Sequence, residues 1–236
     1  PFVLDKDYML RVDLIKLGND DHVLLCVMHH IASDGWSMSI FFEEFVNYYN
    51  SLINGTTPDL KPLSIQYSDY SIWQRNYLQG DVLAKKLSYW EDHLDGVVPL
   101  ELPTDYRRPA IQSTKGAYYS FELNSSLTSG LHELNKSTGS SLFMTLLGIY
   151  KILLSRYSGQ TDICVGTPVA NRGQQEIEGL IGFFINTLAF RSIINWEEGL
   201  IDFLIRIKEN TLEGFEHQDV PFERVVNALV NERDQS

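Results

Sequence analysis

The sequence has few cysteines and no recognisable metal-binding pattern. Cys26 and Cys164 are its only cysteines, and neither Cys-x-x-Cys nor His-Glu-x-x-His occurs. We therefore expect no bound metal ion. Both cysteines lie in short apolar runs, which favours buried free thiols over a disulfide bond, and a reducing, cytoplasmic location.

Clustered positive charge and long apolar runs are also absent. The 19 Lys and Arg residues are outnumbered by 31 Asp and Glu residues, which gives a formal net charge of -12. Nucleic acids and anionic membranes attract clustered Lys and Arg, so we expect neither as a partner. No apolar run reaches the roughly 18 residues of a membrane-spanning helix. Because the chain begins at Pro1 rather than Met, the lack of an N-terminal leader carries no conclusion.

The hydrophobic patterning predicts a mixed α/β protein. The hydrophobic fraction of 44% and the charged fraction of 21% are ordinary for a globular chain. Apolar or alternating runs predict strands at 22–30, 117–123, 162–168 and 185–194. Three- and four-residue spacings predict helices at 37–52, 65–78, 81–94, 127–134, 141–157, 200–216 and 222–230. The 141–157 helix is apolar nearly all round, so we expect it to be central.

Three prolines, Pro99, Pro103 and Pro109, interrupt any regular structure near the middle of the chain. We therefore expect residues 99–116 to form an exposed crossing segment. This segment would connect part of an N-terminal lobe, residues 1–98, to part of a C-terminal lobe, residues 117–236. A two-lobed α/β architecture fits this pattern best.

A His-His-x-x-x-Asp-Gly motif, formed by His29, His30, Asp34 and Gly35, follows the first predicted strand. Successive strand side chains point to opposite faces, so one histidine is available for chemistry and the other belongs to the scaffold. Gly35 comes just before a predicted helix start, where a backbone N–H can face a developing oxyanion. Chance would produce such a match in roughly one chain in a thousand.

Residues 28–37, Met-His-His-Ile-Ala-Ser-Asp-Gly-Trp-Ser, resemble the signature of nonribosomal peptide synthetase condensation domains, within the chloramphenicol-acetyltransferase-like superfamily. Later family motifs are matched in order by residues 67–74, 181–191, 217–223 and 233–236, the last of them cut short. The resemblance implies a two-lobed α/β fold with mixed sheets and flanking helices. Complete family members are longer, so the chain resembles the central part of a domain truncated at both ends.

The resemblance also implies a reaction and its participants. The amine of an acceptor aminoacyl thioester would attack a donor acyl or peptidyl thioester and form a peptide bond. Both substrates would be carried on the 4'-phosphopantetheine arms of donor and acceptor carrier proteins, beside an adenylation domain. The domain itself would bind neither a cofactor nor a metal.

Residue roles follow from the same resemblance. His30 would be the catalytic residue, while His29 and Asp34 shape the loop and Asp34 pairs with Arg172. A loop-surface position is the alternative for Arg172. The positions that could line the substrate tunnel are Trp36, Ser37 and Asn186. For Trp36 the alternative is a core aromatic residue, and for Asn186 a buried amide bonded to backbone.

Comparing free energies indicates the step of the reaction in which the His30 ring acts. An α-amine titrates near pH 8, so about a tenth of it is already neutral at pH 7. Deprotonation before attack then requires only about 1 kcal/mol, less than a general base typically supplies. We hypothesise that His30 Nε2 positions the amine and handles its proton during and after attack, while the Gly35 backbone helps to bind the oxyanion.

Two other functions remain open at this point. An epimerisation domain carries the same histidine motif, although its counterpart of residues 181–191 differs. A non-catalytic module that docks acidic carrier proteins would need a positively charged patch. Arg107-Arg108 is a candidate for this patch; alternatively, the two arginines are a solvated pair in a linker. If the rest of the domain is missing, the tunnel is incomplete and we expect the fragment to be inactive alone.

Overall fold

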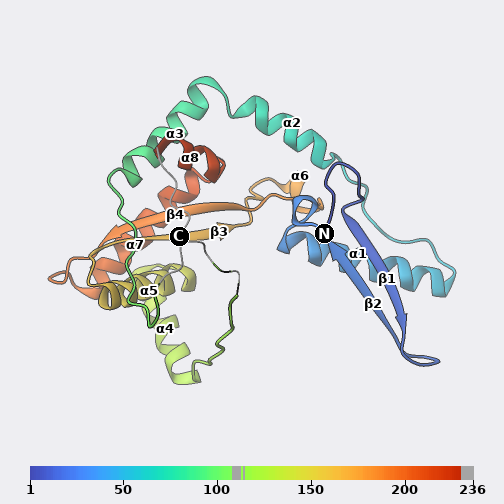
Figure 1. Ribbon diagram of the computed structural model, residues 1–236, viewed down its shortest axis with the longest axis horizontal. Helices are drawn as coiled ribbons and strands as arrows, with labels where there is room; N and C mark the ends of the chain where they lie inside the picture. The colour runs from blue at the N-terminus through green and yellow to red at the C-terminus, as the bar shows by residue number, and fades with distance from the viewer. Residues whose placement is uncertain (108–112, 114, 230–236) are drawn as a thin grey trace. The chain divides into compact units, whose positions relative to one another are not determined.

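The computed structural model describes residues 1–107, 113 and 115–229, and its contacts divide the chain into two compact units. The first unit combines Pro1–Gln79 with Ala170–Asn186, and the second combines Gly80–Val169 with the residues from Thr187 onward. Figure 1 labels the helices and strands of both units. The histidine motif and Arg172 both fall in the first unit.

The first unit begins with an antiparallel strand pair. Strand β1 (Leu10–Lys16), which the sequence patterns did not reveal, pairs with β2 (His22–Met28), so that Leu10 lies opposite Met28. The predicted strand 22–30 is therefore wrong at its end. His29 instead caps a single 3-10 turn, η1 (His30–Ala32), because its Nδ1 accepts a hydrogen bond from the Ile31 N–H.

Three helices complete the first unit: α1 (Gly35–Asn54), α2 (Tyr67–Tyr77) and the short α6 (Gln175–Glu178). Asp34 caps α1, since its Oδ1 accepts a hydrogen bond from the Ser37 N–H at 2.9 Å. Gly55 ends the helix in the left-handed conformation, at φ 65°, which a residue without Cβ adopts readily. The motif thus occupies a strand–turn–helix corner.

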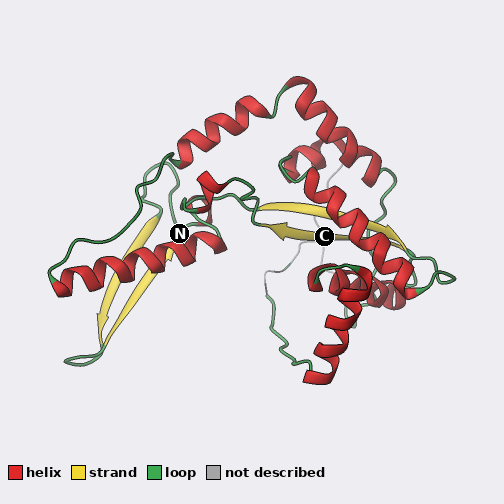
Figure 2. Cartoon of the chain, turned by 180° about the vertical axis from the view of Figure 1, so that it is seen from behind, coloured by secondary structure: helices red, strands yellow, loops and turns green. Residues whose placement is uncertain are grey.

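The described residues of the second unit form two strands and five helices, and Figure 2 draws the two paired strands in opposite directions. In chain order they are α3 (Gly80–Leu94), α4 (Ser125–Thr138), α5 (Leu142–Ser158), β3 (Asp162–Val169), β4 (Asn186–Ile193), α7 (Leu200–Glu216) and α8 (Phe222–Leu229). No single helix in the described part of the chain is long and apolar enough to cross a membrane, although α4 and α5 pass this test as a pair bent by 103°.

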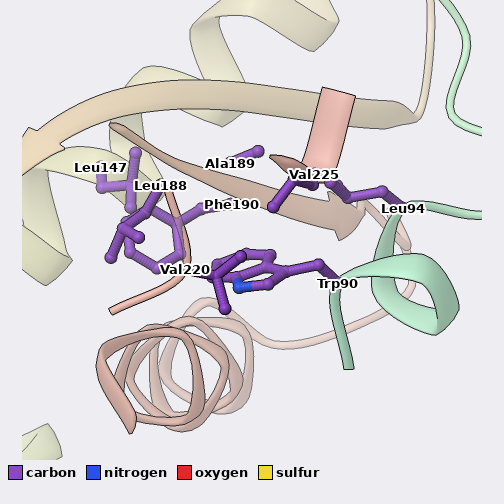
Figure 3. Close-up of a cluster of buried hydrophobic side chains, with 8 residues drawn as sticks. All are labelled: Trp90, Leu94, Leu147, Leu188, Ala189, Phe190, Val220 and Val225. Carbon is purple, nitrogen blue, oxygen red and sulfur yellow. The ribbon is translucent and has the colours of Figure 1, made fainter. Parts of the chain in front are cut away.

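Helices pack on the strands of the second unit through a buried apolar cluster. Figure 3 shows its members: Trp90, Leu94, Leu147, Leu188, Ala189, Phe190, Val220 and Val225. Burying one large apolar side chain stabilises a fold by about 1.5–3 kcal/mol. Gly148 lets α5 approach α7 closely, because a Cβ at this position would lie 2.7 Å from Leu204 Cδ2.

Two expectations from the patterning were wrong. The 117–123 run forms no strand, and Tyr118 is fully exposed, because no strand within the described residues supplies the hydrogen bonds that a sheet requires. The α5 helix is buried on one face only. Met144 and Leu147 are enclosed, whereas Leu146 and Leu153 are 40% and 49% exposed.

The predicted crossing segment is described only in part. Residues 97–107 form no helix or strand. Of the candidate basic pair, Arg107 is exposed, and Arg108 lies outside the described residues. Contacts group residues 80–98 with the second unit, but compact units need not coincide with the lobes of a longer domain. The lobe boundaries at 98 and 116 therefore stay a prediction.

Candidate active site

The His30 ring is held at one nitrogen by the turn that carries it. Its Nδ1 lies 2.6 Å from the carbonyl oxygen of Ser33. Because a carbonyl oxygen only accepts hydrogen bonds, Nδ1 must carry a proton, and Nε2 of the neutral ring keeps its lone pair. His30 is an exposed residue, so its ring is not sealed inside a core. The turn thus leaves Nε2 of an exposed residue as the ring nitrogen that can accept a hydrogen bond.

The neighbouring histidine is a part of the scaffold. His29 Nδ1 accepts the Ile31 N–H at 3.0 Å, so in a neutral ring the proton sits on Nε2. The His29 backbone N–H donates to the Met9 carbonyl at 2.9 Å, and its ring meets Phe2 edge-on with centroids 5.6 Å apart. These contacts tie the turn to the start of the chain.

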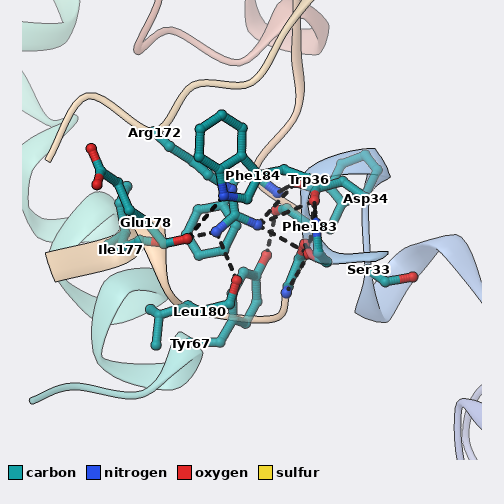
Figure 4. A network of polar contacts seen from close by, with 12 residues as sticks. Ser33, Asp34, Trp36, Tyr67, Arg172, Ile177, Glu178, Leu180, Phe183 and Phe184 are labelled. Carbon is teal, nitrogen blue, oxygen red and sulfur yellow. Dashed lines mark hydrogen bonds and ion pairs between the residues drawn. The ribbon is translucent and has the colours of Figure 1, made fainter. Parts of the chain in front are cut away.

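Asp34 and Arg172 form a buried ion pair, with side chains 3% and 1% exposed. Arg172 Nη2 lies 3.1 and 3.3 Å from the two carboxylate oxygens, as the dashed lines of Figure 4 show. Arg172 Nη1 donates to the carbonyls of Ile177 and Leu180, at 2.7 Å each. The sequence-based expectation that these two residues meet therefore agrees with the geometry, although they are far apart in the chain.

The environment of Asp34 keeps it charged. Burial raises the pKa of its carboxyl, but hydrogen bonds from Ser37 and Phe184, together with the charge of Arg172, outweigh burial, so the pKa lies below its ordinary value. A carboxylate that stays ionised at neutral pH suits an ion pair better than proton transfer. Asp34 therefore serves as an anchor for the loop.

Ser37 differs from the tunnel-lining position predicted for it. Its side chain is fully enclosed, and its Oγ contacts Asp34 Oδ1 at 2.7 Å, the Gly182 carbonyl at 2.9 Å and Arg172 Nη2 at 3.0 Å. The Gly182 N–H also donates to this oxygen, at 3.1 Å. Because every direction around the hydroxyl is occupied, Ser37 links α1 to the 180–184 loop.

Burial and position differ among the other candidate site residues, Trp36, Gly35 and Asn186. Trp36 is 48% exposed and its Nε1 donates to the Glu178 carbonyl at 2.9 Å, so it is not a core residue. Gly35 begins α1, and a Cβ at this position would meet no heavy atom within 4 Å. Asn186 is buried at the start of β4. The tunnel-lining roles of Trp36 and Asn186 and the oxyanion role of Gly35 stay predictions.

Comparison with known proteins identifies the family. The family model for the condensation domain matches residues 1–236. The chain belongs to the condensation-domain family. It is 43% identical over 229 residues to malpinin synthetase of Mortierella alpina, covering 97% of this chain but 3% of that protein. It is 41% identical over 237 residues to gramicidin S synthase 2 of Brevibacillus brevis, covering 100% of this chain and 5% of that protein.

Solved structures support the fold of this condensation-domain segment. The X-domain from teicoplanin biosynthesis matches with a TM-score of 0.88 at 29% identity, over 98% of this chain and 53% of that chain. The four-domain nonribosomal peptide synthetase AB3403 matches with a TM-score of 0.87 at 28% identity, over 100% of this chain and 18% of that one. The chain thus spans about half of the X-domain. The predicted α/β, chloramphenicol-acetyltransferase-like fold class and the resemblance to nonribosomal peptide synthetases are confirmed.

Sequence reasoning missed the residues of the condensation domain that contact the His30 ring and support it. Phe183 meets this ring edge-on, with centroids 5.2 Å apart, and the Tyr67 hydroxyl donates to the Phe183 carbonyl at 2.8 Å. Both residues had been noted only as parts of family motifs. The glycine at position 182 makes room for the Tyr67 ring, because a Cβ there would clash with it, but this close approach is visible only in three dimensions.

Proposed function

We propose that this chain supplies the catalytic histidine of a condensation domain that forms peptide bonds in nonribosomal peptide synthesis. The observation that carries the proposal is the bond from His30 Nδ1 to the Ser33 carbonyl. It leaves Nε2 as a hydrogen-bond acceptor on an exposed ring, which is what an attacking amine needs as a partner. The motif corner around Asp34 and Arg172 holds this turn in place.

In the proposed reaction, the acceptor amine attacks the carbonyl carbon of the donor thioester. Nε2 of His30 accepts a hydrogen bond from this amine and takes its proton as the C–N bond forms. The C–S bond then breaks, and the proton passes to the departing thiolate, so atoms and charges balance. The Gly35 N–H, at the start of α1, would donate a hydrogen bond to the oxyanion, and the helix dipole would add to its effect.

The substrates and partners belong to the same proposal. The donor and acceptor chains would be carried on the 4'-phosphopantetheine arms of two carrier proteins, beside an adenylation domain, and the condensation domain itself would hold no cofactor or metal. Similarity to a four-domain synthetase supports this arrangement. A cytoplasmic location is part of the proposal, and the free thiols of Cys26 and Cys164 support it.

The test uses a complete condensation domain that contains these residues, with both carrier proteins loaded, and detects the condensed product by mass. His30→Ala should lose amide formation throughout the pH range, because positioning is lost at every pH. Full recovery of the rate at about pH 9, where the amine is mostly neutral, would contradict positioning and indicate a base that acts only before attack. His132→Ala, at an exposed site on α4, is the matched control.

The same assay separates this reaction from the other functions considered. Binding of both loaded carriers without any condensed product would favour a docking module. Inversion at the Cα of a carried residue would favour an epimerisation domain.

A further inference from the structure

We infer that Phe183 is a positioning residue whose ring sets the orientation of the His30 imidazole, an inference that rests on the proposed function. The two rings meet edge to face, with centroids 5.2 Å apart and planes inclined by 75°. This is a favourable geometry for aromatic pairs. Phe183 is 40% exposed, whereas the adjacent Phe184 is 3% exposed and contributes to the core.

The His30 ring needs a second contact because its hydrogen bond holds only one atom. The Ser33 carbonyl fixes Nδ1 at 2.6 Å, but an exposed ring that is held by one hydrogen bond can still rotate about that bond. The Phe183 ring restricts this movement from another direction. Since catalysis depends on where Nε2 lies, a restriction on the ring acts directly on the reaction.

Phe183 can serve as a fixed support because the backbone around it is itself held. Its carbonyl accepts the Tyr67 hydroxyl at 2.8 Å. The next N–H, that of Phe184, donates to Asp34 Oδ2 at 3.1 Å. On the other side, Gly182 bonds the Ser37 hydroxyl through both its N–H and its carbonyl. Figure 4 shows how Tyr67, Phe183 and Phe184 converge on the Asp34 network.

Asp34 therefore connects the two supports of the imidazole. The carboxylate caps α1 directly after the turn that carries His30, and it also binds the loop that carries Phe183. The ring and its aromatic support are thus held to one buried ion pair. This arrangement gives residues 180–184 a role in catalysis that requires no contact with substrate.

The experiment compares variants of a complete condensation domain that contains this chain. Phe183→Leu keeps most of the side-chain volume but removes the ring, Phe183→Tyr keeps the ring, and Phe121→Leu removes an exposed ring elsewhere as the control. Two readouts are taken. One is kcat and KM for the loaded acceptor carrier, and the other is the 15N chemical shifts of the two His30 ring nitrogens, which report the tautomer.

We expect Phe183→Leu to lower kcat about threefold to tenfold, the range that corresponds to one aromatic pair, with KM unchanged. The two His30 15N shifts should move toward each other, because the ring no longer keeps a single orientation. Phe183→Tyr should retain both kcat and the shifts. Tyr67→Phe, which removes only the hydroxyl, should change both readouts in the same direction but by less.

Unchanged His30 shifts in Phe183→Leu would overturn the inference, as would an equal loss of kcat in Phe121→Leu. These outcomes are distinct from a failure of the proposed function. If His30→Ala remains fully active, the reaction does not use this ring, whereas the shifts still show whether Phe183 orients it.

Discussion

His29 and His30 are adjacent in the chain, yet their Nδ1 atoms have opposite roles: the first accepts a hydrogen bond and the second donates one. His29 Nδ1 accepts the Ile31 N–H at 3.0 Å, and His30 Nδ1 lies 2.6 Å from the Ser33 carbonyl. In neutral rings, the proton is therefore on Nε2 of His29 and on Nδ1 of His30. The backbone of one short turn thus assigns a scaffold role to one ring and leaves a basic nitrogen on the other.

This difference predicts that substitutions at His29 affect stability more than chemistry. His29→Ala removes the cap of the turn and should lower the free energy of unfolding by about 1 kcal/mol, the usual effect of losing an N-cap. His29→Asn should recover most of this loss, because Asn is a favoured capping residue. Urea unfolding of the three proteins measures the effect. Equal stability of the Ala and Asn variants would contradict a capping role.

Neutralising Asp34 should lower stability far more than neutralising a partly buried carboxylate. Asp34→Asn leaves the Arg172 charge buried without a counterion, which typically lowers stability by about 3–5 kcal/mol. Glu198→Gln, in the more exposed pair with Arg206, should lose at most about 1 kcal/mol. Chemical denaturation at neutral pH compares the two variants. A similar small loss in both would show that the buried pair does not anchor the fold.

The pH dependence of stability follows from the same residue. Burial alone would raise the pKa of Asp34, but its hydrogen bonds and Arg172 hold the pKa below the ordinary value. The stabilisation is therefore fully present above the unfolded pKa of about 3.9 and is lost as the pH falls through the folded pKa. Below about pH 4, the unfolding free energy of the unsubstituted chain should therefore fall more steeply with decreasing pH than that of Asp34→Asn. Denaturant unfolding measured at several acidic pH values compares the two.

Parts of this fold could be predicted from local patterns, and parts could not. The 200–216 spacing predicted α7 (Leu200–Glu216) because an amphipathic helix contains its own hydrogen bonds. The alternation at 117–123 predicted a strand that is absent, because a strand also needs a neighbour. The Asp34–Arg172 pair was expected only through the family resemblance. The Phe183 contact depends on the loop path that Asp34 and Tyr67 determine, and no spacing in the sequence reports it.

A buried lysine in the second unit should make stability rise at alkaline pH. Lys151 is 1% exposed, and burial lowers its pKa to about 8, whereas Lys in an unfolded chain titrates near 10.4. Below the folded pKa, both states carry the proton and the folded state bears the full penalty of burying it. As the pH rises from about 8 to 10.4, the folded state loses the proton first and the penalty disappears.

Lys151→Met tests this prediction, because Met fills similar space without a charge. The variant should be more stable at neutral pH by up to about 3 kcal/mol, the free energy equivalent of the pKa difference. Its stability should also change little between about pH 8 and 10.4, unlike that of the unsubstituted chain. The Ser192 hydroxyl, which accepts from Lys151 at 2.8 Å, still donates to the Arg191 carbonyl in the variant. If Lys151→Met is less stable at neutral pH, the interactions of the Lys151 ammonium offset the free-energy cost of burying its charge, and the prediction is wrong.

A substitution at Gly35 should affect the proposed reaction without affecting the stability of the fold. A Cβ at this position would meet no heavy atom within 4 Å, and the residue begins α1 without a left-handed φ. Gly35→Ala should therefore leave the unfolding free energy unchanged or slightly higher, since Ala is the better helix former. If the Gly35 N–H faces the oxyanion, the added methyl lies beside the reacting carbonyl and should lower kcat about tenfold or more.

The matched control is Gly166→Ala, whose Cβ would come no closer than 3.6 Å to Thr187 in the second unit. This variant should keep both its stability and its kcat. A Gly35→Ala domain that is equally stable and equally active would remove Gly35 from the reaction and leave its role to helix geometry alone. A Gly35→Ala domain that is stable but slow would show that the backbone at the start of α1 must stay open for the substrate.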